Sequence, residues 1–151
     1  MHARASVSVR APRKLVWDIV SNIANAGATV KAIQKLEILH KPESGLVGLK
    51  WRETRTMFGK EATEVMWITS AQDQAFYETR AESHGMVYTS RVAVADAPGG
   101  GTLLSMDFGG EAQTFGARAM GFVFGVLMKG SVRKALTKDL EDIKAAAEAR
   151  A

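Results

Sequence analysis

Glu53 and Arg55 are the two residues of this sequence best suited to chemistry at a binding site. They lie in a stretch, 47–57, whose alternation predicts a β-strand with both side chains on the same face as Trp51. A buried charge without a partner is costly, so an ion pair on an inward face would be retained to orient a carbonyl, carboxylate or hydroxyl of a bound molecule. We give slightly more weight to the alternative, in which a bulge or a twisted strand end carries both side chains to solvent, where such pairs are common and weak.

Other residue types that support catalysis or metal binding are sparse. The Tyr88 phenol could donate a hydrogen bond to a ligand, whereas Tyr77 could equally be an exposed cross-strand residue. His84 lies alone in a predicted turn, so we expect it to face solvent rather than act as a general base. There is no cysteine, the three histidines lack ligand spacing, and no glycine loop leads into a helix as a phosphate loop does. We therefore expect no metal and no other cofactor.

The composition fits one globular domain spanning residues 1–151, with 46% hydrophobic and 24% charged residues. The net charge of +4 comes from scattered basic residues, whereas a nucleic-acid surface needs a clustered basic stripe. The N-terminus lacks the apolar stretch of a signal peptide, and no segment has the roughly 20 apolar residues of a membrane span. We expect a cytoplasmic protein with no nucleic-acid partner and no integral membrane segment.

The last element, predicted as one long helix over 115–147, organises the rest of the chain. Its second half carries an apolar stripe at spacings of four, four and three, made of Val132, Leu136, Leu140 and Ile143. Charged residues, Asp139 among them, are expected mostly away from that stripe. The segment 119–128 is apolar on nearly every side, which is typical of a helix that is buried all round or faces a filled space. We interpret the first half, which Gly130 could kink away from the second, as one wall of a cavity.

The residues before this helix alternate as strands do. Residues 5–9 predict a strand, Pro12 suits a helix start, and apolar residues at helical spacing predict a short helix followed by a helical turn at 23–28. Six further strands are predicted between turn-forming residues, at 35–40, 47–57, 62–69, 75–82, 86–95 and 102–113. Connections this short describe an antiparallel meander, so the predicted order is β-αα-β6-α.

This order resembles the START-like helix-grip superfamily (SRPBCC), which includes the polyketide cyclase/dehydrase and lipid-transport families. Three segments carry the resemblance: strand, Ala-Pro and helix at 7–22, the Pro/Gly hairpin at 93–108, and the amphipathic helix at 134–149. The resemblance implies an α+β fold in which a curved seven-stranded antiparallel sheet wraps around the long C-terminal helix and encloses a hydrophobic cavity. Members of the superfamily bind lipids, sterols, polyketides or other apolar molecules there, and a minority catalyse aldol-type cyclisation or dehydration. The resemblance assigns no catalytic residue to this chain.

On such a fold, a cavity needs large apolar walls and a few polar groups that orient a ligand. Our candidate ligand-binding residues are Trp51, Glu53, Arg55, Met66, Ile68, Tyr88, Met106, Phe108, Met120, Phe124 and Met128. For each apolar residue in this set, plain core packing is the competing interpretation, since pockets are few in any protein.

Three functions remain open on the sequence. We favour the binding or carriage of a hydrophobic small molecule such as a lipid, a polyketide or an aromatic compound. The second is a cyclase/dehydrase-type enzyme in which Glu53, Arg55 and Tyr88 polarise a carbonyl and move protons. The third is a protein-interaction module, whose exposed segment 119–128 would be covered by a partner or by a second copy of the chain in a homodimer. The enzyme requires Glu53 and Arg55 inside, the carrier requires an apolar void, and the module predicts no void.

Overall fold

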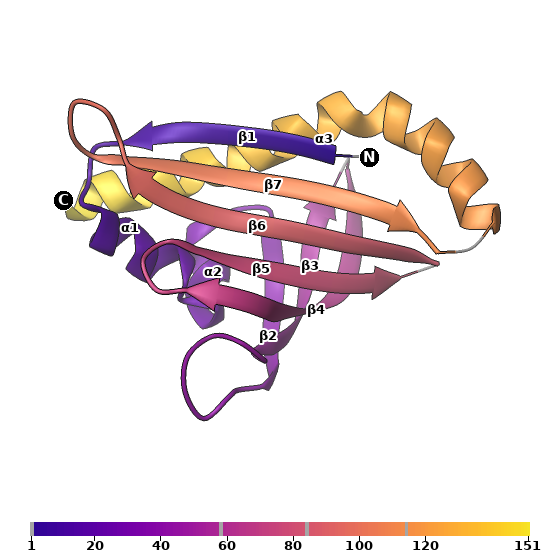
Figure 1. Ribbon diagram of the computed structural model, residues 1–151, viewed down its shortest axis with the longest axis horizontal. Coiled ribbons are helices and arrows are strands. Elements are labelled where there is room, and N and C mark those ends of the chain that lie inside the picture. Colours follow the sequence, from indigo (N-terminus) through magenta and orange to yellow (C-terminus); the bar gives the residue numbers. More distant parts are fainter. Residues whose placement is uncertain (1, 58, 84, 114) are drawn as a thin grey trace.

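Seven antiparallel strands form a curved sheet, and a long C-terminal helix lies across it, as the computed structural model in Figure 1 shows. The description covers residues 2–57, 59–83, 85–113 and 115–151, and for Met57 and 115–129 it extends to the backbone alone. The strands are β1 (His2–Val9), β2 (Ile33–His40), β3 (Lys50–Met57), β4 (Lys60–Gln72), β5 (Phe76–Ser83), β6 (Met86–Asp96) and β7 (Thr102–Ala112). The helices are α1 (Arg13–Val20), a 3-10 turn η1 (Ile23–Asn25), α2 (Ala26–Thr29) and α3 (Phe115–Arg150).

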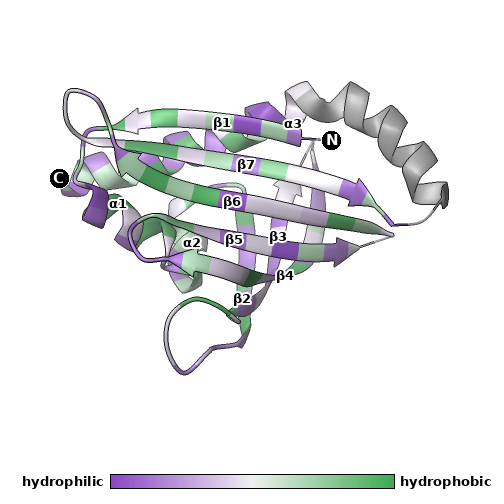
Figure 2. Ribbon diagram, viewed as in Figure 1, coloured by the Kyte–Doolittle hydropathy of each residue, from purple (hydrophilic) through white to green (hydrophobic). Residues whose placement is uncertain are grey.

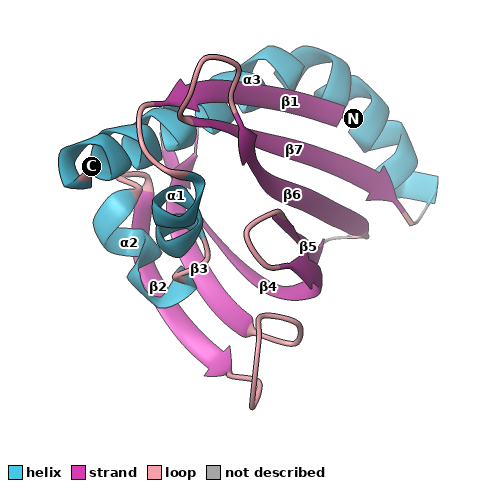
Figure 3. Ribbon diagram, turned by 60° about the vertical axis from the view of Figure 1, so that its left-hand side comes forward, coloured by secondary structure: helices cyan, strands magenta, loops and turns pink. Residues whose placement is uncertain are grey.

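The strand order in the sheet is β1-β7-β6-β5-β4-β3-β2, with every neighbouring pair antiparallel. Strands β2 to β7 follow one another as a meander. The last of them, β7, pairs with the first strand of the chain, β1, with Val9 opposite Thr102. The predicted helix-grip order, β-αα-β6-α, is confirmed. In Figure 3 the strands follow an arc from β1 to β2, and α1, α2 and the C-terminal end of α3 lie on its open side.

Two predicted boundaries shift for local reasons. Strand β3 begins at Lys50 and not at Val47, because Gly48 has a φ of +95° and Leu49 donates its N–H to Leu46, so the chain is still turning there. Strand β4 runs past the predicted end at Thr69, to Gln72, and its pairing with β5 shifts by one residue between Ile68 and Ser70. Such a bulge increases the local twist of the sheet.

The glycine-rich turn between β6 and β7 is tied to the end of β1. Gly101 has a φ of +79°, and a Cβ atom at this position would lie 2.5 Å from the carbonyl oxygen of Val9. Gly100 shares the positive φ, at +106°, but a Cβ there would meet nothing within 4 Å. The turn therefore needs glycine at both positions for its backbone, and at Gly101 also for the close approach of β1.

The predicted apolar stripe of the C-terminal half of α3 is confirmed. Val132, Leu140 and Ile143 are buried, and Leu136 is half-buried. The helix continues through Gly130 without a break in its backbone. A helix with one apolar face buries that face, so this half of α3 packs on the sheet.

Hydrogen bonds from three earlier segments fix the same half of α3. The backbone N–H of Lys31, just after α2, donates to Asp142 at 3.0 Å, and that of Arg10, just after β1, donates to Glu148 at 2.8 Å. The Lys144 ammonium also donates to a carbonyl oxygen of β1. Carboxylates that accept backbone N–H groups in this way bind more strongly than neutral acceptors.

The hydrophobic core lies where α1, the C-terminal half of α3 and one end of the sheet meet. Trp17 of α1 packs edge-to-face on Tyr77 of β5, with ring centroids 6.2 Å apart. Among the described residues, exposed large apolar side chains occur on the edge strand β2, at Ile38 and Leu39, and in the loop that follows it, at Val47, where Figure 2 shows a hydrophobic stretch. None of the described helices is long and apolar enough to cross a lipid bilayer.

Candidate functional site

A cavity of about 520 Å³ lies between the inner face of the sheet, the segment from α1 to α2, and α3. Most of its wall is apolar, with side chains from every layer: Ile19, Val20, Ile23, Val30, Ile33, Met66, Val92, Met106, Val132, Leu136 and Ile143. Small-molecule sites in proteins typically measure about 300–1,000 Å³ and are lined mainly by apolar groups. The cavity is therefore of the size and character of a ligand site.

The two periodicities of the backbone explain why these side chains meet. Every second residue of a strand faces the same side, which brings Trp51, Glu53 and Arg55 of β3 to the cavity together. Residues three or four apart on a helix share a face, and on α3 this includes Asp139, which is three residues after Leu136. The sheet's curvature then lets the inward faces of distant strands oppose one another.

A charged cluster interrupts the apolar wall. The Arg55 guanidinium donates from Nε to Oε2 of Glu53 at 3.1 Å and from Nη1 to Oδ2 of Asp139 at 3.0 Å. The Trp51 indole N–H donates to the other Glu53 oxygen at 3.3 Å. The side chains of Arg55, Glu53 and Asp139 are only 20%, 11% and 8% exposed. We call these three residues the Arg55 cluster.

The structure thus corrects the interpretation that a bulge carries Glu53 and Arg55 to solvent. Pairing between β3 and β4 is continuous from Lys50 to Met57, so the alternation is not interrupted and both side chains stay inward. The single positive charge of Arg55 balances one of the two carboxylate charges beside it. Buried charges of this kind are stable only where every member of the cluster is hydrogen-bonded. The cluster meets that condition through Trp51 and Asp139.

Burial and neighbouring charges act in opposite directions on the pKa values of this cluster. Burial raises the pKa of Asp139, and Glu53 adds to this, so the pKa stays above its ordinary value although Arg55 opposes the shift. Burial lowers the pKa of Arg55, but Asp139 and Glu53 outweigh it, so its pKa is raised and the guanidinium stays charged. A buried carboxyl whose pKa is raised, beside a fixed cation in a cavity, is a combination common at functional sites.

Most predicted site residues lie at this cavity. Five of them line it besides the charged pair, namely Trp51, Met66, Tyr88, Met106 and Phe108. Tyr88 stacks on Phe108 with ring centroids 5.8 Å apart. Ile68 does not line it, because core side chains cover it almost completely and leave it 1% exposed. Met120, Phe124 and Met128 lie outside the residues whose side chains are described.

Two residues of the wall run against the sequence prediction. The sequence pattern predicts Asp139 among the charged residues on the outer side of the last helix, yet its carboxylate is buried against Arg55. The signal for this was its position seven residues after Val132 and four before Ile143, on the apolar stripe itself. Tyr77, for which an exposed position was considered, is 7% exposed and lines the cavity.

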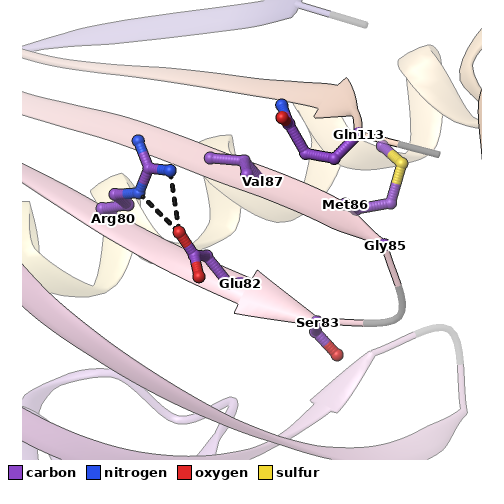
Figure 4. A pocket seen from close by; sticks show the side chains of 7 residues that line it. All are labelled: Arg80, Glu82, Ser83, Gly85, Met86, Val87 and Gln113. Atoms are coloured by element: carbon purple, nitrogen blue, oxygen red, sulfur yellow. Dashed lines mark hydrogen bonds and ion pairs between the residues drawn. The ribbon is translucent and has the colours of Figure 1, made fainter.

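A second depression, of about 490 Å³, lies on the other face of the sheet at the ends of β5 and β6. Its residues Arg80, Glu82 and Val87 alternate with residues that line the cavity. Figure 4 shows the Arg80 guanidinium donating two hydrogen bonds to Glu82, at 3.0 and 2.7 Å. This pair is 42% and 54% exposed, so water competes for its polar groups, and we assign the candidate site to the cavity instead.

No group of three or more metal-ligating side chains comes together within the described part of the chain. Four acidic residues, Glu53, Glu64, Asp107 and Asp139, do line the cavity. Two of them already contact the Arg55 guanidinium, which is an arrangement for ion pairing.

Comparison with known families agrees with this architecture. The family described as polyketide cyclase / dehydrase and lipid transport matches residues 1–148. The chain belongs to this family. The polyketide cyclase / dehydrase and lipid transport family covers both catalysts and carriers by its description, so the choice between these roles rests on the cavity. No curated protein matches the chain in sequence.

Solved structures share the family's fold at low sequence identity. A START superfamily protein from Mycobacterium smegmatis has a TM-score of 0.81 at 16% identity, over 99% of each chain. The Zhui aromatase/cyclase from Streptomyces sp. R1128 has a TM-score of 0.77 at 16% identity, over 99% of this chain and 94% of that one. Ginseng major latex-like protein 151 from Panax ginseng has a TM-score of 0.76 at 14% identity, over 97% of each chain. Similarity at this level establishes the helix-grip fold that this family member shares with them.

Proposed function

We propose that this protein binds a hydrophobic small molecule in the cavity, with a polar group of that molecule placed against the Arg55 cluster. The proposal rests on one observation, a cavity of about 520 Å³ whose mainly apolar wall carries the buried Arg55 cluster. Apolar walls supply most of the affinity of such sites, and the few polar groups fix the orientation of the ligand. Membership of a family described by cyclisation, dehydration and lipid transport supports the same function.

The Arg55 cluster suits the orienting role. A guanidinium has five N–H donors, and the two bonds to Glu53 and Asp139 use one on Nε and one on Nη1. Because its carboxylate partners hold it rigidly, the guanidinium can offer a remaining N–H to a ligand oxygen with little further loss of entropy. A carbonyl or hydroxyl oxygen is the kind of acceptor that such a donor binds.

Catalysis of the cyclase/dehydrase type is the second candidate, and one observation favours it. Asp139 is a buried carboxyl with a raised pKa, held against Arg55 at the wall of a cavity. In that role Arg55 would stabilise negative charge that develops on a carbonyl oxygen, and Asp139 would give or take the proton at the neighbouring carbon or hydroxyl. Tyr88, also expected in this role, lines the cavity and stacks on Phe108.

The interaction-module hypothesis receives less support. It predicts that no void exists, whereas the sheet, the short helices and α3 enclose one. The side chains of 119–128, which would form its interface, lie outside the described set.

Filling the cavity tests the binding function. Ala81 of β5 lines the cavity, so Ala81→Trp should weaken binding of the neutral fluorescent probe N-phenyl-1-naphthylamine at least about tenfold, which corresponds to about 1.4 kcal/mol. Ala95 of β6 is exposed, so Ala95→Trp makes the same chemical change outside the cavity and should leave binding unchanged. Ala135→Trp fills the cavity from α3 and guards against a folding defect at one position.

Native mass spectrometry and fluorescence titration give the outcome. Probe binding by the wild type and by Ala95→Trp, with its loss in both filled variants, supports the proposal. Equal binding by all four proteins would place the probe elsewhere, and no binding by the wild type to this probe or to any co-purified apolar molecule would refute it.

A further inference from the structure

The hydroxyl group of Tyr77 has no hydrogen-bond partner within the described part of the chain. Tyr77 is 7% exposed and lines the cavity, and its only specific contact there is the ring of Trp17. Yet no fully buried side-chain oxygen or nitrogen of the described residues lacks a partner. The Tyr77 oxygen is therefore not sealed in the core: it reaches the open space of the cavity.

Packing holds this phenol in place before any ligand arrives. Its ring stands at 82° to that of Trp17, with centroids 6.2 Å apart, and Trp17 is itself buried. The backbone on either side is paired with Ala71 of β4 and Val92 of β6. A ring fixed by its neighbours loses little conformational entropy on binding, which is how preorganised groups gain affinity.

The phenol also stays protonated. Burial raises the pKa of Tyr77, and the negative charge of Glu53 raises it further. Tyr77 is therefore a hydrogen-bond donor throughout the physiological pH range. The negative charge of Glu53 also disfavours negative charge on the group that accepts this hydrogen bond.

Charges around this position disfavour an anion. Glu53 and Asp139 both contact the single guanidinium of Arg55, so the cluster holds two carboxylates for one cation. A second guanidinium, that of Arg91, also lines the cavity and lies over the Phe76 ring, 4.0 Å from its centroid. Four carboxyl groups, those of Glu53, Glu64, Asp107 and Asp139, line the described wall beside these two guanidiniums, so the wall has no excess of positive charge to neutralise a ligand carboxylate.

Resting on the cavity-binding function above, we propose that Tyr77 donates a hydrogen bond to an uncharged acceptor of the ligand, and that the site selects ketones or esters over carboxylates. Tyr77 and the Arg55 cluster would then contact polar groups of the same molecule. A ketone or ester oxygen accepts from the phenol without adding charge beside Glu53. A carboxylate would accept the same bond but would add a further negative charge beside the carboxylates of the cluster.

Three anthracenes with the same apolar body separate these requirements: 2-acetylanthracene, 2-ethylanthracene and anthracene-2-carboxylate. The wild type should bind the ketone about 3- to 10-fold more tightly than the ethyl compound, the usual value of one neutral hydrogen bond. It should bind the carboxylate at least about tenfold more weakly than the ketone at pH 7.5. Tyr77→Phe should lose the preference for the ketone and bind the ethyl compound as the wild type does.

Stability of the ligand-free protein is the second readout. Because the hydroxyl has no partner there and phenylalanine keeps the packing on Trp17, Tyr77→Phe should leave the Tm unchanged. A Tm fall of about 2–4 °C or more would show that the hydroxyl bonds to the protein, and would overturn the proposal. An unchanged ketone preference in Tyr77→Phe, or wild-type binding of the carboxylate as tight as of the ketone, would overturn it as well. Binding of none of the three compounds by the wild type would instead refute the cavity-binding function itself.

Discussion

Replacing Arg55 with methionine tests whether the Arg55 cluster is held together as the structure indicates. The substitution keeps an unbranched, flexible side chain of similar reach and removes the charge. It abolishes the bonds to Glu53 at 3.1 Å and to Asp139 at 3.0 Å, and leaves both carboxylates almost fully buried. The loss should therefore resemble the breaking of a buried ion pair and not that of a surface pair.

Two estimates give the size of the effect. Unit charges about 4 Å apart attract by about 4 kcal/mol at an effective dielectric constant of about 20. Removing one partner of a buried ion pair destabilises proteins by about 3–5 kcal/mol. For a chain of this length about 1 kcal/mol lowers Tm by about 2–4 °C, so we expect a fall of about 6–20 °C at pH 7.

The pH dependence has a defined sign. Without the guanidinium, nothing at the cluster offsets the burial that already raises the pKa of Asp139, so its pKa rises further in the folded variant. A folded state that binds protons more tightly than the unfolded state gains stability as the pH falls. Arg55→Met should thus recover part of its lost stability between pH 7 and pH 5, whereas a simple loss of packing would not depend on pH.

The chain contains a matched control for this experiment. Arg80 contacts Glu82 two residues along its strand, as Arg55 contacts Glu53, but this second pair is half-exposed. Arg80→Met should cost less than about 1 kcal/mol. Thermal unfolding by circular dichroism at pH 7 and pH 5 compares the two variants directly. Equal Tm losses in both, or greater loss for Arg55→Met at pH 5 than at pH 7, would refute the reasoning.

Two further predictions concern how the elements are joined. Burial raises the pKa of Asp142, but a lysine side chain and the N–H of Lys31 lower it more, so the net pKa is below its ordinary value. Asp142→Asn should cost about 1–2 kcal/mol at pH 7. The cost should shrink only below the ordinary carboxyl range, as the pH falls through the lowered pKa of the folded wild type; a urea midpoint difference as large at pH 2 as at pH 7 would contradict this. An L-residue in the left-handed region costs about 1–2 kcal/mol, and Gly100→Ala should cost only that amount. Gly101→Ala should cost clearly more, because its Cβ would also meet the Val9 oxygen. Equal losses in thermal unfolding would show that β1 does not approach the turn so closely.

The secondary structure was largely predictable because it follows local periodicity. Alternation in β3 put Glu53 and Arg55 on the face of Trp51, and the spacing of apolar residues in α3 identified its buried stripe. Local patterns classify residues by polarity, however, and for this reason the pattern places Asp139 on the wrong side of its helix. Its partner Arg55 is 84 residues away, and only the folded sheet brings the two together. Ile68 shows the opposite error, because a pattern that predicts an inward side chain cannot distinguish core from cavity wall.

The pairing of β1 with β7 has a consequence for synthesis on the ribosome. The first strand registers Val9 with Thr102 and His2 with Gly109, partners made about 100 residues later. At about 5–20 residues per second, translation needs roughly 5–20 s to supply them. The hydrogen bonds from Arg10 to Glu148 and from Lys31 to Asp142 form later still, because both carboxylates belong to the last helix. During that interval the nascent chain has an unpaired edge strand and an uncovered apolar face, so chaperones at the exit tunnel have a defined segment and a defined time in which to act.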